Sequence, residues 1–115
     1  MIILPVDESY AFDYLAILYV KAKKGMDVQE EADRVEQCLK RQIENIGDIL
    51  ESKEFDNMVK VNEKTFAAID AAHENKISAS EVQKVNHERF LAKRALQTKF
   101  WPSEPMLERK TLDAK

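Results

Sequence analysis

The sequence predicts an all-α fold, either a four-helix bundle or an antiparallel helical hairpin with two additional helices. The 115 residues include only two Gly and three Pro, so long uninterrupted helices are expected. With 44% hydrophobic and 34% charged residues, the composition is that of a soluble helical protein with one modest core. Apolar residues also recur at helical spacing. We therefore expect a helical domain over residues 1–101 and a C-terminal tail over residues 102–115.

The first helix is predicted over about residues 8–24. Asp7 or Ser9 can cap it, and Gly25 is its stop signal. Its middle, residues 10–20, is apolar nearly all round, which is typical of a helix buried by several neighbours or by a second subunit. Asp13 interrupts this segment. It either faces water at an edge or pairs with a basic residue of the last helix, since a buried charge must be paired.

The second helix is predicted over about residues 28–53. Its inward positions alternate in spacings of four and three, as in a coiled-coil seam: Val28, Ala32, Val35, Leu39, Gln42, Ile46 and Ile49. Such a seam needs a partner, either the neighbouring hairpin or the same helix of another copy. Gly47 indicates a bend or a close helix contact. Residues 27–54 hold nine acids and four bases, so this helix is acidic.

The last two helices, over about residues 54–75 and 79–100, are predicted to form a long antiparallel hairpin. The pattern Val-Asn-x-x-x-Phe occurs in both, at residues 61–66 and 85–90. Asn62 falls on the seam, where Asn sets register rather than stability, and Asn86 is its candidate partner across the hairpin. Ser78 and Glu81 form a capping box. Because residues 78–101 hold five bases and two acids, the acidic second helix is their natural neighbour, within the chain or between chains.

These features favour a non-enzymatic helical protein–protein interaction module that self-associates. A bundle of this size can bury one apolar stripe on each helix, and the first helix is apolar on more than one side. A homo-oligomer is therefore expected, with a different protein partner as the alternative, and no cofactor. The candidate interface or register residues are Tyr14, Leu18, Val35, Leu39, Ile46, Asn62, Phe66, Asn86 and Phe90.

Two segments carry hypotheses of metal chemistry. Residues 70–81 match a calcium loop at Asp70 and Glu81, but Ala72 cannot coordinate and Asn75 replaces the required Gly, so a plain helical turn is favoured. Residues 44–50 resemble the acidic segment of the MazG-like nucleotide pyrophosphohydrolases. That resemblance implies a magnesium-dependent nucleotide pyrophosphohydrolase-like enzyme as the alternative function. Asn45 stands where that family has its second Glu, and Asp33 and Glu36 are predicted on the same helix as Asp48, whereas that family brings its two acidic pairs together from separate helices. An acidic solvated face is the simpler interpretation.

Charge and location give further expectations. A net charge of −3 does not favour binding of nucleic acid by the chain as a whole. Five basic residues on one helix, as on the last helix here, are more often solvated or ion-paired than bound to nucleic acid. A single cysteine, Cys38, favours a reducing, cytoplasmic setting and, beside Leu39, a small core residue. The first residues carry no evident signal peptide. The longest apolar run is about half a membrane span and contains Asp13, so no transmembrane helix is expected.

Several short motifs together resemble a family of small uncharacterised all-helical bacterial proteins. That family has a "Leu-x-Ile-Leu-x-x-Lys" first helix, an "Asn-x-x-Leu-Trp-x-Ile-Glu" third helix and an "Asn-x-x-Arg-x-x-x-Lys-Arg" fourth helix. The matching stretches here are residues 14–21, 61–70, 86–96 and 108–110, with Phe66 in place of the typical Trp region. Its members are often encoded near glycosyltransferases. The resemblance therefore implies helices over most of the chain and a supporting rather than a catalytic role.

Overall fold

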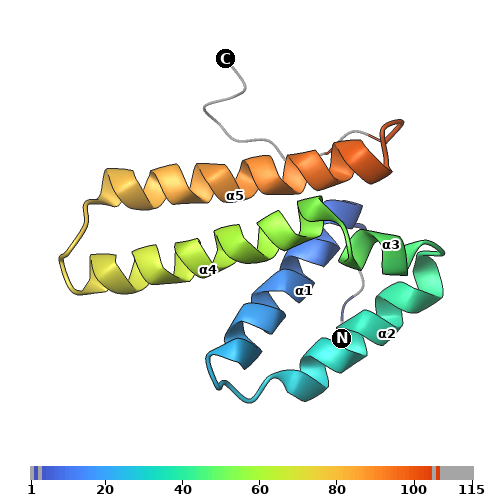
Figure 1. Cartoon of the computed structure of the whole chain (residues 1–115), viewed down its shortest axis with the longest axis horizontal. Helices are drawn as coiled ribbons and strands as arrows, with labels where there is room; N and C mark the ends of the chain where they lie inside the picture. The colour runs from blue at the N-terminus through green and yellow to red at the C-terminus, as the bar shows by residue number, and fades with distance from the viewer. Residues whose placement is uncertain (1, 3, 105, 107–115) are drawn as a thin grey trace.

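The computed structural model describes Ile2, residues 4–104 and Met106. In this part of the chain it contains five helices and no strand: α1 Glu8–Lys23, α2 Gln29–Gln42, α3 Ile46–Leu50, α4 Lys53–His73 and α5 Ala79–Phe100. Figure 1 shows α4 and α5 as a long antiparallel hairpin, with α1 at a steep angle to it and α2 folded back beside α1. The predicted all-α fold is confirmed, with one helix more than expected.

Local signals account for most helix ends. Gly25, at a positive φ of 86°, follows the C-cap of α1, as predicted. Ser52 caps α4, and its hydroxyl accepts a hydrogen bond of 3.1 Å from the Phe55 amide. Ser78 does the same for α5, accepting from the Glu81 amide at 3.3 Å. The predictions over residues 54–75 and 79–100 therefore match α4 and α5 within two residues at each end. Of the predicted tail, the structure describes residues 102–104 and Met106.

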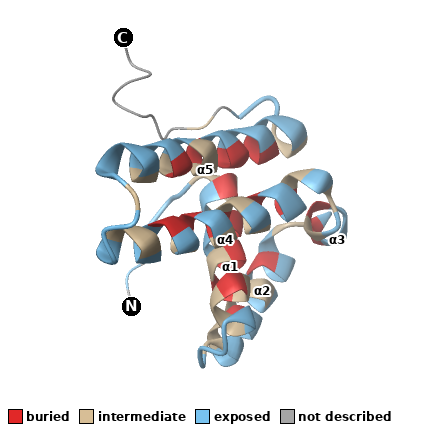
Figure 2. Ribbon diagram, turned by 60° about the vertical axis from the view of Figure 1, so that its left-hand side comes forward, coloured by how far each residue is buried: buried red, intermediate tan, exposed pale blue. Residues whose placement is uncertain are grey.

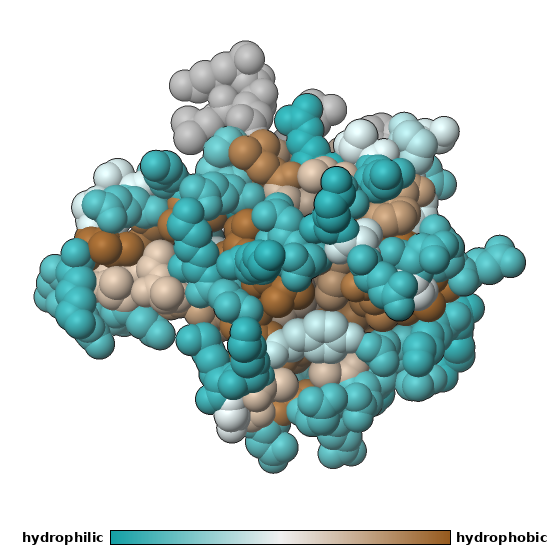
Figure 3. Space-filling model, in the orientation of Figure 1, coloured by the Kyte–Doolittle hydropathy of each residue, from teal (hydrophilic) through white to brown (hydrophobic). Residues whose placement is uncertain are grey.

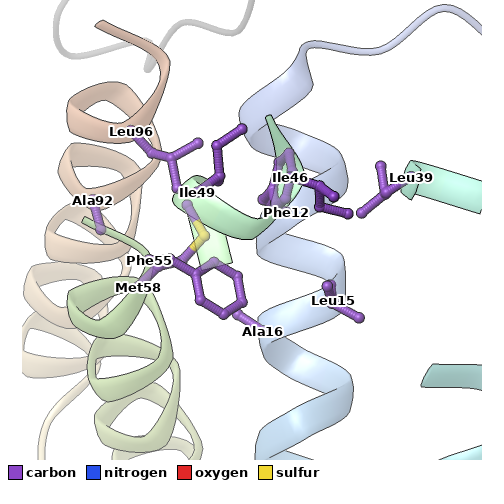
Figure 4. Packing of buried hydrophobic residues seen from close by; sticks show 10 residues of the cluster. All are labelled: Phe12, Leu15, Ala16, Leu39, Ile46, Ile49, Phe55, Met58, Ala92 and Leu96. Atoms are coloured by element: carbon purple, nitrogen blue, oxygen red, sulfur yellow. The ribbon is translucent and has the colours of Figure 1, made fainter. Parts of the chain in front are cut away.

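The prediction of one continuous helix over residues 28–53 is wrong. α2 ends at Gln42, and Ile43 adopts an extended conformation (φ −125°, ψ 112°) before the five residues of α3. The bend redirects the chain so that Ile46 and Ile49 enter the core beside α1 and α5, where they are 9% and 0% exposed (Figure 4). Burial of these two side chains stabilises the break, since each contributes about 1.5–3 kcal/mol.

Gly47 lies in α3, directly after this bend. A Cβ placed on it would meet no atom within 4 Å, so the close helix contact predicted as one of two explanations for Gly47 is absent. The predicted coiled-coil seam is likewise split. Ala32 and Leu39 are buried from α2, whereas the continuation of the seam, Ile46 and Ile49, belongs to the separate helix α3; Leu39, Ile46 and Ile49 still share one core cluster.

The apolar middle of α1 is buried by neighbours of its own chain. α1 packs against α2, α4 and α5, and Phe12, Leu15 and Ala16 are fully inaccessible to solvent. Figure 2 shows buried residues along α1 and along the facing sides of α4 and α5. α2 packs mainly on α1, while α5 packs mainly on α4 and α1. The expected pairing of the acidic second helix with the basic last helix is therefore not a main contact within the chain.

Candidate functional site: an apolar groove beside α1 and α2

A groove of about 750 Å³ runs between the N-terminal segment, α1, α2 and the residue that follows α5. This volume lies in the range of typical binding pockets. Mostly apolar side chains line it: Leu4, Pro5, Val6, Asp7, Glu8, Ala11, Tyr14, Val35, Cys38, Leu39, Gln42, Ile43 and Trp101. Three of the predicted interface residues, Tyr14, Val35 and Leu39, are among them.

Exposed apolar side chains concentrate beside this groove. Within the described part of the chain, eight large apolar side chains are exposed, and five of them lie between positions 2 and 14: Ile2, Leu4, Val6, Tyr10 and Tyr14. Ile2 is 83% exposed, Leu4 70% and Val6 53%, although Leu4 and Val6 both line the groove. The N-terminal segment thus borders the groove while leaving most of its own apolar surface in water. Leu4, Val6 and Tyr14 line the groove, whereas Ile2 and Tyr10 do not, and the Tyr10 ring contacts Lys93 of α5. Exposed apolar surface that gathers in one region marks interaction sites.

Two tyrosines of α1 fix the walls of the groove. The Tyr14 hydroxyl donates to the Glu31 carboxylate, and the Tyr19 hydroxyl donates to Glu36. The hydrogen bond to Glu31, together with partial burial, raises the pKa of Tyr14. Burial, followed by the hydrogen bond to Glu36, raises the pKa of Tyr19 more strongly. Both tyrosines stay neutral donors at physiological pH, so they hold α2 at a set position beside α1.

Cys38 lies on the groove wall and is exposed, so the prediction of a small core residue is wrong. α2 turns one face toward α1, burying Ala32 and Leu39, and Cys38 falls on the neighbouring face. The Gln42 amide nitrogen lies 3.2 Å from its sulfur, within hydrogen-bonding distance. The thiol is therefore accessible from within the groove.

A buried polar cluster joins α1, α4 and α5 behind the groove. The Asp13 carboxylate, in a side chain 3% exposed, pairs with the Arg89 guanidinium at 2.6 Å (Oδ2 to Nη2) and 3.3 Å (Oδ1 to Nε). The Asn62 amide donates a third hydrogen bond to Asp13 at 2.9 Å. Of the two alternatives for Asp13, the ion pair with the last helix is the one found. The sequence indicated the helix but not which of its five bases.

The expected partnership of Asn62 with Asn86 is not formed through the Asn62 amide group. Both hydrogens of that group are used, one by Asp13 and one by the Met58 carbonyl oxygen at 2.9 Å. Asn62 is 1% exposed, whereas Asn86 is only half-buried on α5. Asn62 therefore helps to hold α1 on the hairpin, because its partner is on α1.

α5 makes further polar contacts with α1. Gln97, 2% exposed, accepts from the Ser9 amide at 2.9 Å, and its own amide group donates to Glu8 at 2.7 Å. The buried Lys93 places its ammonium 5.5 Å from the centre of the Tyr10 ring. Three successive turns of α5 thus fix its register on α1 by specific pairing. Sequence reasoning missed Gln97, because a glutamine in a basic helix gives no signal of burial.

The remaining predicted interface residues are either buried in the core or half-buried. Leu18 and Phe90 are buried at 1% and 4% exposure, and Ile46 is in the core, so none of these three is available to a partner. Phe66 is half-buried on α4. Figure 3 shows apolar surface over the projecting end of the hairpin and between the helices in the middle of this face.

The segments considered for metal chemistry do not converge. Asp33 and Glu36 lie on α2 and Asp48 on α3, so the prediction that one helix carries all three carboxylates is wrong. Over the described residues, no three or more His, Cys, Asp or Glu side chains lie close enough together to hold a metal ion. Asp70 is inside α4 and Glu81 inside α5, and the turn between them is the capped helical turn that was favoured.

The basic residues of α5 are divided between two faces. Arg89 and Lys93 point into the protein, while Lys84, Arg94 and Lys99 are exposed.

None of the helices in the described part of the chain is long and apolar enough to cross a membrane. Comparisons with protein-family models, curated proteins and solved structures found no match. The resemblance to the bacterial family encoded near glycosyltransferases therefore stays a prediction.

Proposed function

We propose that this protein is a helical protein–protein interaction module that self-associates through the groove between α1 and α2. The observation that carries the proposal is the location of its exposed apolar surface. Three of the eight exposed large apolar side chains in the described region, Leu4, Val6 and Tyr14, line one groove of about 750 Å³. Burying apolar surface contributes about 25 cal/mol per Å². An interface that covers this region is therefore expected to gain more binding free energy than an interface on another face of the molecule.

The groove is also prepared for binding. The tyrosine–glutamate hydrogen bonds fix α2 against α1, and the core beneath the groove is buried, so little ordering is needed when a partner binds. The groove is lined by polar residues, including Asp7, Glu8 and Gln42, together with a larger number of apolar residues. Protein interfaces commonly combine an apolar core with polar residues at the rim. Most of the middle of α1, which first suggested self-association, is buried by the chain itself; Ala11 and Tyr14 are the parts of it that line the groove.

Size-exclusion chromatography coupled to light scattering tests the proposal. The wild-type chain is expected to elute as a dimer at micromolar concentration. Cys38→Arg places a long charged side chain in the groove without touching the core and is expected to yield a monomer. Gln37→Arg adds the same charge at the residue that precedes Cys38 on α2. Gln37 does not line the groove, so this variant is expected to leave the dimer intact.

Circular dichroism of both variants checks that the helical content is retained. A wild-type chain that remains monomeric at micromolar concentration would remove the self-association proposal. A dimer that both arginine variants weaken equally would place the interface elsewhere on the molecule.

A further inference from the structure

Of the four long helices in the described part of the chain, α2 is the least embedded in the core. It buries two of its 14 residues, Ala32 and Leu39, whereas α4 buries five and α5 six. It packs mainly on α1, where the two tyrosine–glutamate hydrogen bonds hold it. We propose that α2 transiently leaves α1 as a unit while α1, α4 and α5 stay folded, and that this movement opens and closes the groove.

Both ends of α2 are joined to the rest of the protein by residues outside the helices, which can act as hinges. Before α2 the chain turns at Gly25, whose φ of 86° glycine adopts without strain. After α2 the chain is extended at Ile43, and the buried Ile46 and Ile49 then anchor α3 in the core. Changes of backbone angle at these two places move α2 without displacing α1 or α3.

Once it has left α1, α2 is expected to lose its helical conformation. A helix of 14 residues is marginal in water because its nucleation is unfavourable. Val28 at its N-cap provides no side-chain hydrogen bond, whereas Ser52 and Ser78 cap α4 and α5. The undocked segment therefore exposes its backbone amides to exchange with solvent.

Undocking also removes the groove, because four of its lining residues belong to α2: Val35, Cys38, Leu39 and Gln42. This consequence rests on the proposed function, whereas the movement of α2 does not. A partner that fills the groove binds only the docked state and stabilises that state by mass action. Undocking of α2 and dimerisation through the groove therefore compete.

Thiol labelling of the native protein tests the movement. In the Cys38→Ser chain, Ala32→Cys places the single thiol on the buried face of α2, where Ala32 is 1% exposed. Ala92→Cys places it in the core on α5, where Ala92 is 3% exposed, and is the matched control. A maleimide reacts with each thiol only after the surrounding region opens. At low protein concentration we expect labelling at position 32 to be at least about tenfold faster than at position 92, because it requires undocking alone.

Equal labelling rates at the two positions, both following global unfolding in urea, overturn the inference. Hydrogen–deuterium exchange of the wild-type chain checks the movement without a substitution. The amides of residues 29–42 should exchange together and ahead of those of α4 and α5, and uniform protection of the three helices contradicts the proposal. Tyr14→Phe/Tyr19→Phe should speed labelling at position 32 several-fold. Tyr10→Phe, at a ring that contacts α5, is the control and should leave the rate unchanged.

Raising the protein concentration separates this inference from the proposed function. If the groove dimer requires docked α2, labelling at position 32 slows as light scattering shows the dimer accumulating. Fast labelling in a chain that stays monomeric supports the movement of α2 and removes the groove dimer. A dimer whose labelling at position 32 does not slow removes the control of the groove by α2.

Discussion

Replacing Arg89 by methionine tests the buried cluster that holds α1 on the hairpin. The change keeps the apolar stem of the side chain and removes the charged guanidinium. The Asp13 side chain, which is 3% exposed in the wild-type chain, then has the Asn62 amide as its remaining donor in this cluster. Removing one partner of a buried ion pair costs about 3–5 kcal/mol. Because the Arg89 side chain is 29% exposed and water can reach the vacated position, we expect the lower end, about 3 kcal/mol.

The assay is urea unfolding followed by far-UV circular dichroism. A chain of 115 residues is expected to have a free energy of unfolding of roughly 6–17 kcal/mol. With an m-value of about 1.5–3 kcal/mol/M, the loss lowers the midpoint by about 1–2 M. The double variant Asp13→Asn/Arg89→Met removes both charges and is expected to recover most of the loss, because no buried charge is left unpaired.

Lys64→Met is the matched control on the same hairpin. Lys64 pairs with Glu88 at 2.9 Å, but the two side chains are 59% and 33% exposed. Its removal is expected to leave the midpoint nearly unchanged, since water screens such pairs. A loss below about 1 kcal/mol for Arg89→Met, or a double variant as unstable as the sum of the single ones, would refute this account of the cluster.

Three further outcomes are expected. Asn62→Val deprives Asp13 of a donor and should lower the free energy of unfolding by about 1–3 kcal/mol in urea titrations; the same change at half-buried Asn86 should cost clearly less, and equal losses would contradict this. Ile49→Ala should cost about 2–5 kcal/mol because Ile49 is fully buried, and a calorimetric melting point unchanged from wild type would exclude α3 from the core. Because the folded-state pKa of Tyr19 lies above the unfolded value of about 10, its neutral form stabilises the fold below that pH, and this contribution is lost as the pH rises further. Tyr19→Phe should therefore show a shallower decline of stability between about pH 10 and 12; identical pH profiles would count against a role for the Glu36 hydrogen bond.

Local signals predicted the end of α1 at Gly25 and the start of α5 at Ser78, because those residues act on their own turn of backbone. The Ser52 cap of α4 was not predicted. The break at residues 43–45 carries no Gly or Pro. The apolar spacing also runs across it, since Ile46 and Ile49 must be apolar whether they continue α2 or turn into the core. The free energy gained by burying these two side chains in the core decides between a continued helix and a break. The spacing of apolar residues along the sequence does not indicate that free energy.

The same limit applies to the site. Tyr14, Val35 and Leu39 were predicted as interface residues and do line the groove, because helical periodicity identifies apolar faces. Leu4, Val6 and Trp101 line the groove because the segment before α1 and the residue after α5 lie close together in the fold. No local sequence pattern predicts that arrangement. Asn62 was placed correctly on a seam, but its partner comes from a helix 49 residues earlier in the sequence.

The polar contacts between α1 and α5 have a consequence for the order of folding. They join residues 76 positions apart at Asp13 and Arg89, and 88 apart at Ser9 and Gln97, whereas α4 and α5 are neighbours in sequence. Closing long loops is slow, so we expect the α4–α5 hairpin to form first and α1 to dock late. Changes at Asp13 should then mainly accelerate unfolding, while Ser78→Ala, at the hairpin turn, should slow folding. Stopped-flow measurements of both rates would distinguish the two classes, and a slower folding rate for Asp13→Asn would reverse the proposed order.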